Sequence, residues 1–452
     1  MSDSRHLFVI VLVGCAACGD DGSTDADSGR DEGVSDLGEE PMDAPPDVDA
    51  IVPEAGLDGG SGWDGRDLPD VAWDLPACVT SYGIVARQIV EDEGRPILLT
   101  NLVAERGRAA IAWDSRGPHV ARIDGSEIVE LSIGADPPDE IIGLGLAEDE
   151  LLAAGTFSEG GTPLLGLVSF GVDATDSVVA DAPPWAAHSG LTGLWATPDE
   201  RWLMGVFEPR AEVEGETGPG LRILHVSRAL DLLSPPRWLE TGADTMFPGI
   251  EQSLVRVVGG PDDGDVVRKI IWDERGRGSR AVEIIPFSGA AVEDPIVVSL
   301  NGAYRSVDDI DVAQRSDGAL AVLIRSRLDD IPAPTLLASV VRTDTGAMPD
   351  EPTVFAETAG RATAVIASSR SGADVFWQPY GEPSLHLCIS VVDLAPCAEP
   401  LRVGAGASAD EVLARRDGAD LVVAWREVGP FATTDAGTRR VEGIYWARLT
   451  CD

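Results

Sequence analysis

The stretch Asp417-Gly418-Ala419-Asp420-Leu421-Val422-Val423-Ala424-Trp425 contains the pattern around which this chain is organised. An acidic turn that contains glycine is followed by about five apolar residues. Asp and Gly suit such a turn because both tolerate left-handed backbone angles, and Asp also bonds to its own backbone. The apolar run is short, rich in β-branched residues and bounded by turns, which is typical of a buried strand. A second apolar strand, Gly443–Leu449, follows after a polar interval.

Related strands recur along most of the chain, and we interpret each as the first strand of a repeating unit. The intervals between their centres run from 41 to 67 residues and average about 52. A period near 50 residues with about four strands per unit is typical of a β-propeller. The sequence therefore predicts an all-β fold, a seven-bladed β-propeller over residues 78–452, with six or eight blades as alternatives and two β-sandwiches as the main rival. The centres are Ile111, Leu152, Leu203, Val255, Val322, Val375 and Val423.

Three of the turn-and-strand segments resemble a known repeat. Residues Ala196–Leu203, Arg315–Leu320 and Arg416–Leu421 are similar to the "SPDG-x-x-L" turn and strand of TolB-type propeller repeats. Glu200 stands where that pattern has glycine. The resemblance implies blades of a kind that mostly bind other proteins.

The first eighteen residues have the composition of a targeting segment. Arg5 precedes the short apolar run Leu7–Val13, and small residues follow, which describes a secretory signal peptide and not a membrane span. Leu12-Val13-Gly14-Cys15 resembles the bacterial lipobox, which implies a diacylglycerol anchor on the cysteine. The leucine favours Cys15, whereas Cys18 is the alternative because cleavage there leaves an even number of cysteines. An ordinary signal cleaved without lipid is the third interpretation.

Residues 19–77 form an acidic segment. From Gly19 to Ala77 there are 18 acidic residues against Arg30 and Arg66, with many Gly, Pro and Ser and no hydrophobic period. Such a segment buries too little apolar surface to offset chain entropy, so we expect a disordered linker that like charges extend. It resembles the acidic stalk behind the lipid anchor of many deltaproteobacterial, myxobacterial-type surface lipoproteins. We therefore expect an exported protein held at the cell envelope, on a membrane, through its N-terminal lipid.

The whole chain is strongly acidic, with a formal net charge of −43 at pH 7. Such a surface repels phosphate backbones, so the composition excludes nucleic acid as a partner. A protein or a glycan remains as the expected partner.

Four cysteines belong to the predicted propeller. Cys78 opens it and Cys451 is the penultimate residue, so a bridge between them would join the two ends of a ring. Cys388 and Cys397 lie nine residues apart, which suits a local hairpin bridge. An exported protein permits disulfides. We predict these two bridges, with two other pairings open.

The sequence contains few residues that point to catalysis or to a metal. None of the five histidines has a metal-ligand spacing, and we assign no catalytic residue. Two acidic loops place carboxylates close together, where Ca²⁺ would relieve their mutual repulsion. Calcium is thus the one cofactor considered. The loops contain Asp262, Asp263 and Asp265, and Asp308, Asp309 and Asp311.

Three functions fit this composition and fold. The first is a non-enzymatic binding or scaffold module at the cell envelope, with blade-connecting loops as the binding surface. The alternatives are a propeller-type polysaccharide hydrolase or lyase, and a structural envelope component. Acids, arginines and aromatic residues from several blades that converge at one channel mouth would favour the enzyme.

The lipid anchor is tested by mass spectrometry of the mature N-terminus. We expect a diacylglyceryl-modified Cys15 as the first residue. A modified Cys18 would move the cleavage site, and an unmodified mature N-terminus would show an ordinary secretory signal.

Overall fold

The chain divides into two units, Met1–Gly62 and Trp63–Asp452, and all residues described here belong to the second. The computed structural model describes residues 71–451 apart from 92–94, 134–137, 148–149, 160–161, 172–176, 181–189, 197–201, 214–215, 228–232, 234–236, 241–254, 260–262, 271–280, 289–290, 301–303, 329–333, 344–350, 358–363, 369–371, 380–381, 383, 392–393, 395–396, 406–407, 430–431 and 435–436. The expected signal peptide, Cys15, Cys18 and most of the acidic linker lie outside the described residues.

Within these described ranges the secondary structure is β-strand, with no helix and therefore no helix that could cross a membrane. The strands are β1 (Val79–Glu91), β2 (Leu98–Glu105), β3 (Arg108–Asp114), β4 (Pro118–Asp124), β5 (Glu127–Leu131), β6 (Glu140–Leu146), β7 (Glu150–Glu159), β8 (Thr162–Gly171), β9 (Ser177–Ala180), β10 (Gly190–Ala196), β11 (Trp202–Val213), β12 (Glu216–Val226), β13 (Arg237–Glu240), β14 (Val255–Gly259), β15 (Asp263–Ile270), β16 (Ala281–Ser288), β17 (Ala291–Val292), β18 (Ile296–Ser299), β19 (Tyr304–Gln314), β20 (Leu320–Leu328), β21 (Pro334–Val341), β22 (Thr353–Glu357), β23 (Ala364–Ser368), β24 (Ala373–Trp377), β25 (Leu385–Val391), β26 (Leu401–Val403), β27 (Ser408–Asp417), β28 (Asp420–Val428), β29 (Ala432–Thr434) and β30 (Gly437–Leu449).

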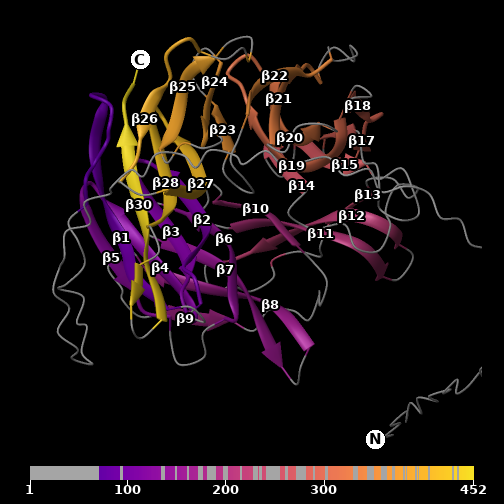
Figure 1. Ribbon diagram of the computed structural model, residues 1–452. Helices are drawn as coiled ribbons and strands as arrows, with labels where there is room; N and C mark the ends of the chain where they lie inside the picture. The colour runs from indigo at the N-terminus through magenta and orange to yellow at the C-terminus, as the bar shows by residue number, and fades with distance from the viewer. Residues whose placement is uncertain are drawn as a thin grey trace, which may run out of the picture. The chain divides into compact units, whose positions relative to one another are not determined.

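The strands of the described residues pair into seven sheets, and the pairs are antiparallel (Figure 1). Six sheets take their strands from one continuous segment of the chain: β2–β5, β6–β9, β10–β13, β14–β18, β19–β22 and β23–β26. The seventh has the order β1-β30-β28-β27, with β29 beside β30. The expectation of an all-β fold built from strands in consecutive sheets is confirmed.

The first strand of each sheet contacts the first strand of the next. Contacts join β2 to β6, β6 to β10, β10 to β14, β14 to β19, β19 to β23, and β23 to β27. Strand β27 of the seventh sheet in turn contacts β2 of the first. We call these seven strands the inner strands.

The seventh sheet contains both ends of the described chain. Strand β1 is hydrogen-bonded to β30 from Val79, opposite Leu449, to Glu91, opposite Arg439. In Figure 1 the indigo β1 accordingly lies against the yellow β30. This pairing fixes the start of the folded unit to its end.

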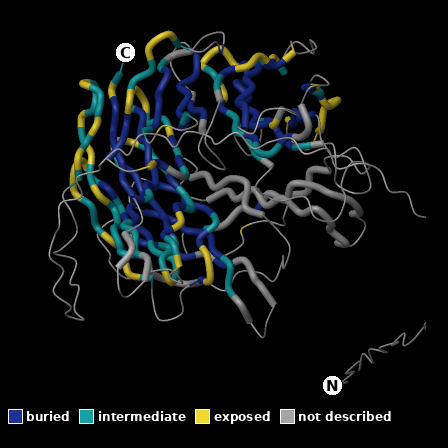
Figure 2. Tube along the Cα trace, viewed as in Figure 1, coloured by how far each residue is buried: buried dark blue, intermediate teal, exposed yellow. Residues whose placement is uncertain are grey.

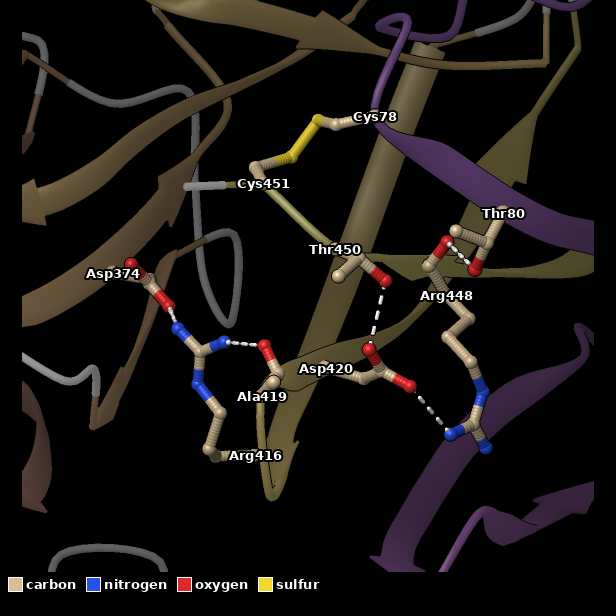
Figure 3. Close-up of a disulfide and its surroundings, with 9 residues drawn as sticks. All are labelled: Cys78, Thr80, Asp374, Arg416, Ala419, Asp420, Arg448, Thr450 and Cys451. Atoms are coloured by element: carbon tan, nitrogen blue, oxygen red, sulfur yellow. Dashed lines mark hydrogen bonds and ion pairs between the residues drawn. A yellow bond between two sulfur atoms is a disulfide. The ribbon is translucent and has the colours of Figure 1, made fainter.

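The cysteines join the same two ends. Cys78 and Cys451 are at disulfide distance, with their Cα atoms 5.1 Å apart, and so are Cys388 and Cys397, with Cα atoms 5.7 Å apart. Figure 3 shows the first bridge beside Thr450, whose backbone N–H donates to the Cys78 carbonyl at 3.0 Å. Both bridges match the predicted pairs.

The turn quoted first, before β28, holds neighbouring sheets together. Gly418 has φ 60°, the left-handed conformation for which glycine is suited. The Asp417 carboxylate accepts a hydrogen bond from the Gly107 N–H in the β2–β3 turn at 2.7 Å, and Arg448 donates to the Gly107 carbonyl at 2.9 Å. On the other side, the Arg416 guanidinium pairs with the buried carboxylate of Asp374 in β24 (Figure 3).

The hydrophobic core lies between successive sheets. In β28, Leu421, Val423 and Trp425 pack against the β23–β26 sheet, whereas Val422 and Ala424 pack against the β2–β5 sheet. Trp425 and Ala424 are both fully buried. The apolar run of this strand is continuous because both of its faces are covered, which Figure 2 shows as an unbroken buried stretch.

The recurrent apolar strands are not the first strands of their sheets, as the sequence suggested. Ile111, Leu152, Leu203, Val322, Val375 and Val423 lie on β3, β7, β11, β20, β24 and β28, each the second strand of its sheet. Only Val255, on β14, lies on a first strand. Second strands have partners on both edges and apolar neighbours on both faces, whereas several inner strands also carry charged residues.

Packing onto the sheets begins before Cys78, the expected start of the domain. Trp73 contacts Tyr82, with ring centroids 4.7 Å apart, and Tyr445, with centroids 5.7 Å apart. Asp74 forms a β-bridge with Gly404. The end of the acidic segment is thus held on the sheets by aromatic packing, which the acidic composition of the whole segment did not predict.

Removal of the two disulfides should have unequal effects. The Cys78–Cys451 bridge closes a separation of 373 residues and the Cys388–Cys397 bridge one of 9. Loop-closure entropy then predicts a loss of up to about 6 kcal/mol in unfolding free energy for Cys78→Ser/Cys451→Ser, and about 3 kcal/mol for Cys388→Ser/Cys397→Ser. Urea denaturation of both double variants measures the difference. Equal losses would contradict the entropic role of the long bridge.

Candidate functional site

Several inner strands are irregular where they pair with the second strand of their sheet. Bulges interrupt their pairing between Leu99 and Asn101 in β2, between Val307 and Asp309 in β19, and between Asp410 and Val412 in β27. A bulge bends the strand and changes the direction of nearby side chains. Polar residues lie at or beside these three bulges.

Polar side chains at these irregular positions bridge to the next inner strand. The Glu411 carboxylate of β27 accepts a hydrogen bond from the Leu99 N–H of β2 at 2.7 Å. Asn101 of β2 donates to the Ile142 carbonyl of β6 at 3.3 Å. Asp311 of β19 accepts from the Ile366 N–H of β23 through Oδ2 at 2.9 Å. Each of these bonds pairs a polar side chain with a backbone group of the neighbouring inner strand.

Charged residues from three sheets meet around Asp311. Its Oδ1 lies 3.8 Å from Arg256 Nε of β14, and Asp309 Oδ1 lies 3.8 Å from Arg256 Nη2. Arg325 of β20 approaches Asp309 Oδ2 at 3.7 Å, and Arg415 of β27 interacts with Asp311 electrostatically. We call Arg256, Asp309, Asp311, Arg325 and Arg415 the inner-strand cluster.

The protein surroundings raise the pKa of Asp311. Desolvation is the largest cause, the positive charges of Arg256 and Arg415 and the Ile366 N–H oppose it, and Asp309 adds to it. Desolvation also lowers the pKa of Arg415, which nevertheless keeps exposed surface.

A small cavity lies beside the two carboxylates of the cluster. Asp309, Asp311 and Arg325 line it together with Ile310, Leu323 and Leu336. Its volume is about 10 Å³, which is close to the space that one water molecule needs. The cavity therefore has room for a water molecule between polar partners.

The Asp308, Asp309 and Asp311 loop, considered as a calcium site, is part of strand β19 and faces arginines. Asp308 accepts a hydrogen bond from Arg327 at 3.0 Å, while Asp309 and Asp311 face Arg256. The guanidinium groups of these arginines thus relieve the repulsion between the carboxylates, which is the role that a calcium ion was expected to have. Within the described ranges, no group of three acidic, His or Cys side chains is arranged to hold a metal.

Only part of the other proposed calcium loop belongs to the described residues. Asp262 lies outside the described residues, Asp263 is exposed, and Asp265 is buried on β15. Desolvation, together with the charges of Asp263 and Glu293, raises the pKa of Asp265 to about 6, against a hydrogen bond from Thr343. The structure thus places two of the three carboxylates on one strand, where they repel each other.

The arginines of the inner-strand cluster were missed by the sequence analysis. Arg256, Arg325 and Arg415 come from three sheets and are separated by 69 and 90 residues in the chain. Only Asp309 and Asp311 carried a signal, the i, i+2 spacing that places both side chains on one face of a strand. Knowledge of the sheet order would have been needed to find the rest.

Comparisons with known proteins give structural likenesses alone. No family model and no protein of curated function matches the sequence. An ulvan polysaccharide lyase bound to a saccharide is similar at 8% identity, with 80% of this chain and 94% of that chain covered and a TM-score of 0.48. An α-L-arabinofuranosidase from Fusarium graminearum (8% identity, 68% and 91% covered, TM-score 0.41) and a Penicillium chrysogenum α-L-arabinanase (9%, 65% and 89%, 0.39) are similar too. These TM-scores are too low to establish a shared fold.

The buried Asp265 should make stability depend on pH. Because its folded pKa of about 6 exceeds the usual 3.8, the folded state binds the proton more tightly, and stability falls as pH rises from about 4 to above 6. Asp265→Asn removes this cost, so we expect about 2 kcal/mol more stability at pH 8 and no gain at pH 4. Denaturant titrations at both pH values measure it. The control Asp263→Asn removes only part of the repulsion on Asp265, so its gain in stability at pH 8 should be smaller. An equal gain for Asp265→Asn at both pH values would contradict the raised pKa of Asp265.

Proposed function

We propose that the described sheets form one closed, seven-bladed β-propeller. The support is the succession of first-strand contacts from β2 to β27 and back to β2, together with the shared sheet of β1 and β30. In a propeller the first strands surround a central channel. The inner-strand cluster would then lie on the wall of that channel, with Arg415 exposed to the water inside it.

The expected address of the protein is part of this proposal. Disulfides form in oxidising compartments, so the Cys78–Cys451 and Cys388–Cys397 pairs support export. The signal-like N-terminus with Cys15, and the acidic segment after it, support a lipid anchor at the cell envelope. A TolB-like origin of the blades stays a proposal that rests on the quoted turn motifs.

The function that the site supports best is hydrolysis of a polysaccharide. The observation that carries it is the pair Asp309 and Asp311 on one face of β19, with a water-sized cavity and three arginines beside it. Side chains two residues apart on a strand leave from Cα atoms about 6.6 Å apart, which allows their carboxyl groups a similar separation. A glycosidase that inverts configuration needs two carboxyl groups about 6.5–9.5 Å apart, with a water between the base and the sugar.

The surroundings of the two carboxyl groups assign them different roles. Burial raises the pKa of Asp311, which suits the role of the general acid that protonates the leaving oxygen. Asp309, held near Arg256 and Arg325, would be the base that activates the water. Arg415 and Arg256, which keep exposed surface, would bind hydroxyl or carboxylate groups of the glycan.

A non-enzymatic glycan- or protein-binding module is the second candidate, and one observation favours it. The cavity of about 10 Å³ holds a water but not a sugar ring, so a glycan would have to bind from the channel side. Arginines already neutralise both carboxylates. A cluster with this geometry would also serve simply to join three sheets.

Substitutions that replace the aspartates of the cluster by uncharged asparagines test the proposed hydrolase function. With the full-length chain, neutral and uronate-containing polysaccharides are the substrates and new reducing ends are the readout. Asp311→Asn and Asp309→Asn should each lower kcat by about 10² to 10⁴-fold, because each removes a general acid or base. The matched control is Asp308→Asn, whose carboxylate pairs with the exposed Arg327 next to the cluster.

Folding and binding must be followed in the same variants. Asp311 also accepts the Ile366 N–H, so circular dichroism should show that Asp311→Asn keeps the parent β-sheet signal. Folded variants as active as Asp308→Asn would contradict the assigned roles. A parent chain that binds a glycan without cleaving it would favour the binding module.

A further inference from the structure

A second group of reactive side chains lies outside the inner-strand cluster, in a groove at the β3–β4 hairpin. The groove has a volume of about 690 Å³, is open to solvent, and is lined by Ser115, Arg116, His119, Glu130, Leu131 and Ile133, among others. We propose that Ser115, His119 and Glu130 form an acyl-transfer site that hydrolyses small carboxylic esters of polar alcohols.

Two hydrogen bonds connect the three side chains in a row. His119 Nε2 lies 3.1 Å from Ser115 Oγ, and His119 Nδ1 lies 2.8 Å from Glu130 Oε1. With Nδ1 protonated and donating to Glu130, Nε2 accepts the serine proton. These are the relations of nucleophile to base and of base to orienting carboxylate that define a Ser-His-acid triad on any fold.

The strands hold the imidazole in place. His119 on β4 lies opposite Trp113 on β3, and the two rings stack with centroids 5.1 Å apart and 9° between their planes. Glu130 comes from β5, the next strand of the same sheet. The paired strands β4 and β5 thus position the base and the carboxylate, and Ser115 lies in the short turn that joins β3 to β4.

The nucleophile sits at a strained turn. Ser115 precedes Arg116, which has φ 104°, a backbone conformation that is strained for a residue with a Cβ. The Asp114 carboxylate accepts hydrogen bonds from the Arg116 and Gly117 N–H groups at 3.2 and 3.1 Å, which stabilises the turn. Those two backbone donors face Asp114, so the Arg116 side chain is the groove's charged donor for an oxyanion.

The proposed reaction uses only the side chains of this site, the ester and water. Ser115 Oγ attacks the ester carbonyl carbon while its proton moves to His119 Nε2, and the carbon–alkoxy bond breaks as that proton passes to the leaving oxygen. Water then attacks the acyl-serine in the same way, releasing a carboxylic acid and restoring the serine. No oxidant or metal is needed.

The groove itself indicates the substrate class. Leu131 and Ile133 offer an apolar surface to a short acyl chain, and Arg116 offers a cation to the carbonyl oxygen. Because the groove is open to solvent, the alcohol part of the ester can extend out of it. A short-chain ester on a large polar molecule fits these features.

A fluorophosphonate probe and 4-nitrophenyl acetate test the proposal on the full-length chain. Peptide mass spectrometry should locate the phosphonate on Ser115. Ser115→Ala should abolish labelling, and His119→Ala should slow it at least about 100-fold. The matched control is Ser316→Ala, an exposed serine in the β19–β20 turn, which should label at the parent rate.

Glu130 is a positioning residue and needs a separate readout. Glu130→Gln should lower kcat for 4-nitrophenyl acetate about tenfold with KM unchanged, whereas a merely structural carboxylate would alter thermal stability and leave kcat intact. No phosphonate on Ser115 of the folded parent chain would overturn the proposal. Labelling that His119→Ala leaves unchanged would overturn it equally.

Discussion

The pairing of β1 with β30 is the constraint on which the rest of the structure depends. It places the first described strand at the outer edge of a sheet whose other strands come from the C-terminal end of the chain. That sheet then packs on the β2–β5 sheet through a core that includes Trp446 and Ile111. Ordering contacts so distant in sequence carries a large loop-closure entropy. A ladder along most of β1, the Cys78–Cys451 bridge, and the Asp417 and Arg448 bonds to the β2–β3 turn offset that entropy at one place.

How much of the fold the sequence predicts depends on which strand is considered. Second strands such as β28 are covered on both faces, so their apolar runs are continuous and their recurrence is readable. The first strands carry bulges and charged residues, and their pattern is mostly lost. Only β14, with its Val-Arg-Val-Val run, is a first strand with a readable apolar pattern, and the six other marked strands are second strands that were mistaken for first strands. The two disulfides were predictable because their positions follow from the ends of the domain and from a hairpin. The candidate site was predictable only for Asp309 and Asp311, since Arg325 comes from the paired strand β20 and Arg256 and Arg415 come from other sheets.

Arginine suits the surroundings of the inner-strand cluster, although it is also the cation used almost everywhere in this chain, where Lys269 is the only lysine. The chain has a net charge of −43, yet this group places three arginines with two aspartates. Burial would lower the pKa of a lysine at such a position and remove its charge. A guanidinium keeps its charge, is weakly hydrated, and spans more than one carboxylate from one position. Arg256 does this by approaching both Asp309 and Asp311.

Asp311 has a structural hydrogen bond and a proposed chemical role, and a different carboxylate oxygen serves each of them. Oδ2 accepts the Ile366 N–H at 2.9 Å, so a proton on this oxygen would weaken the bond between two sheets. Oδ1 lies 3.8 Å from Arg256 Nε, which is beyond hydrogen-bond distance, so a proton can occupy it without displacing a donor. The desolvation that raises the pKa of Asp311 thus favours a proton on the oxygen turned toward Arg256. Protonation there weakens only the attraction to the arginine, so the carboxyl group can exchange a proton while it still holds β19 to β23.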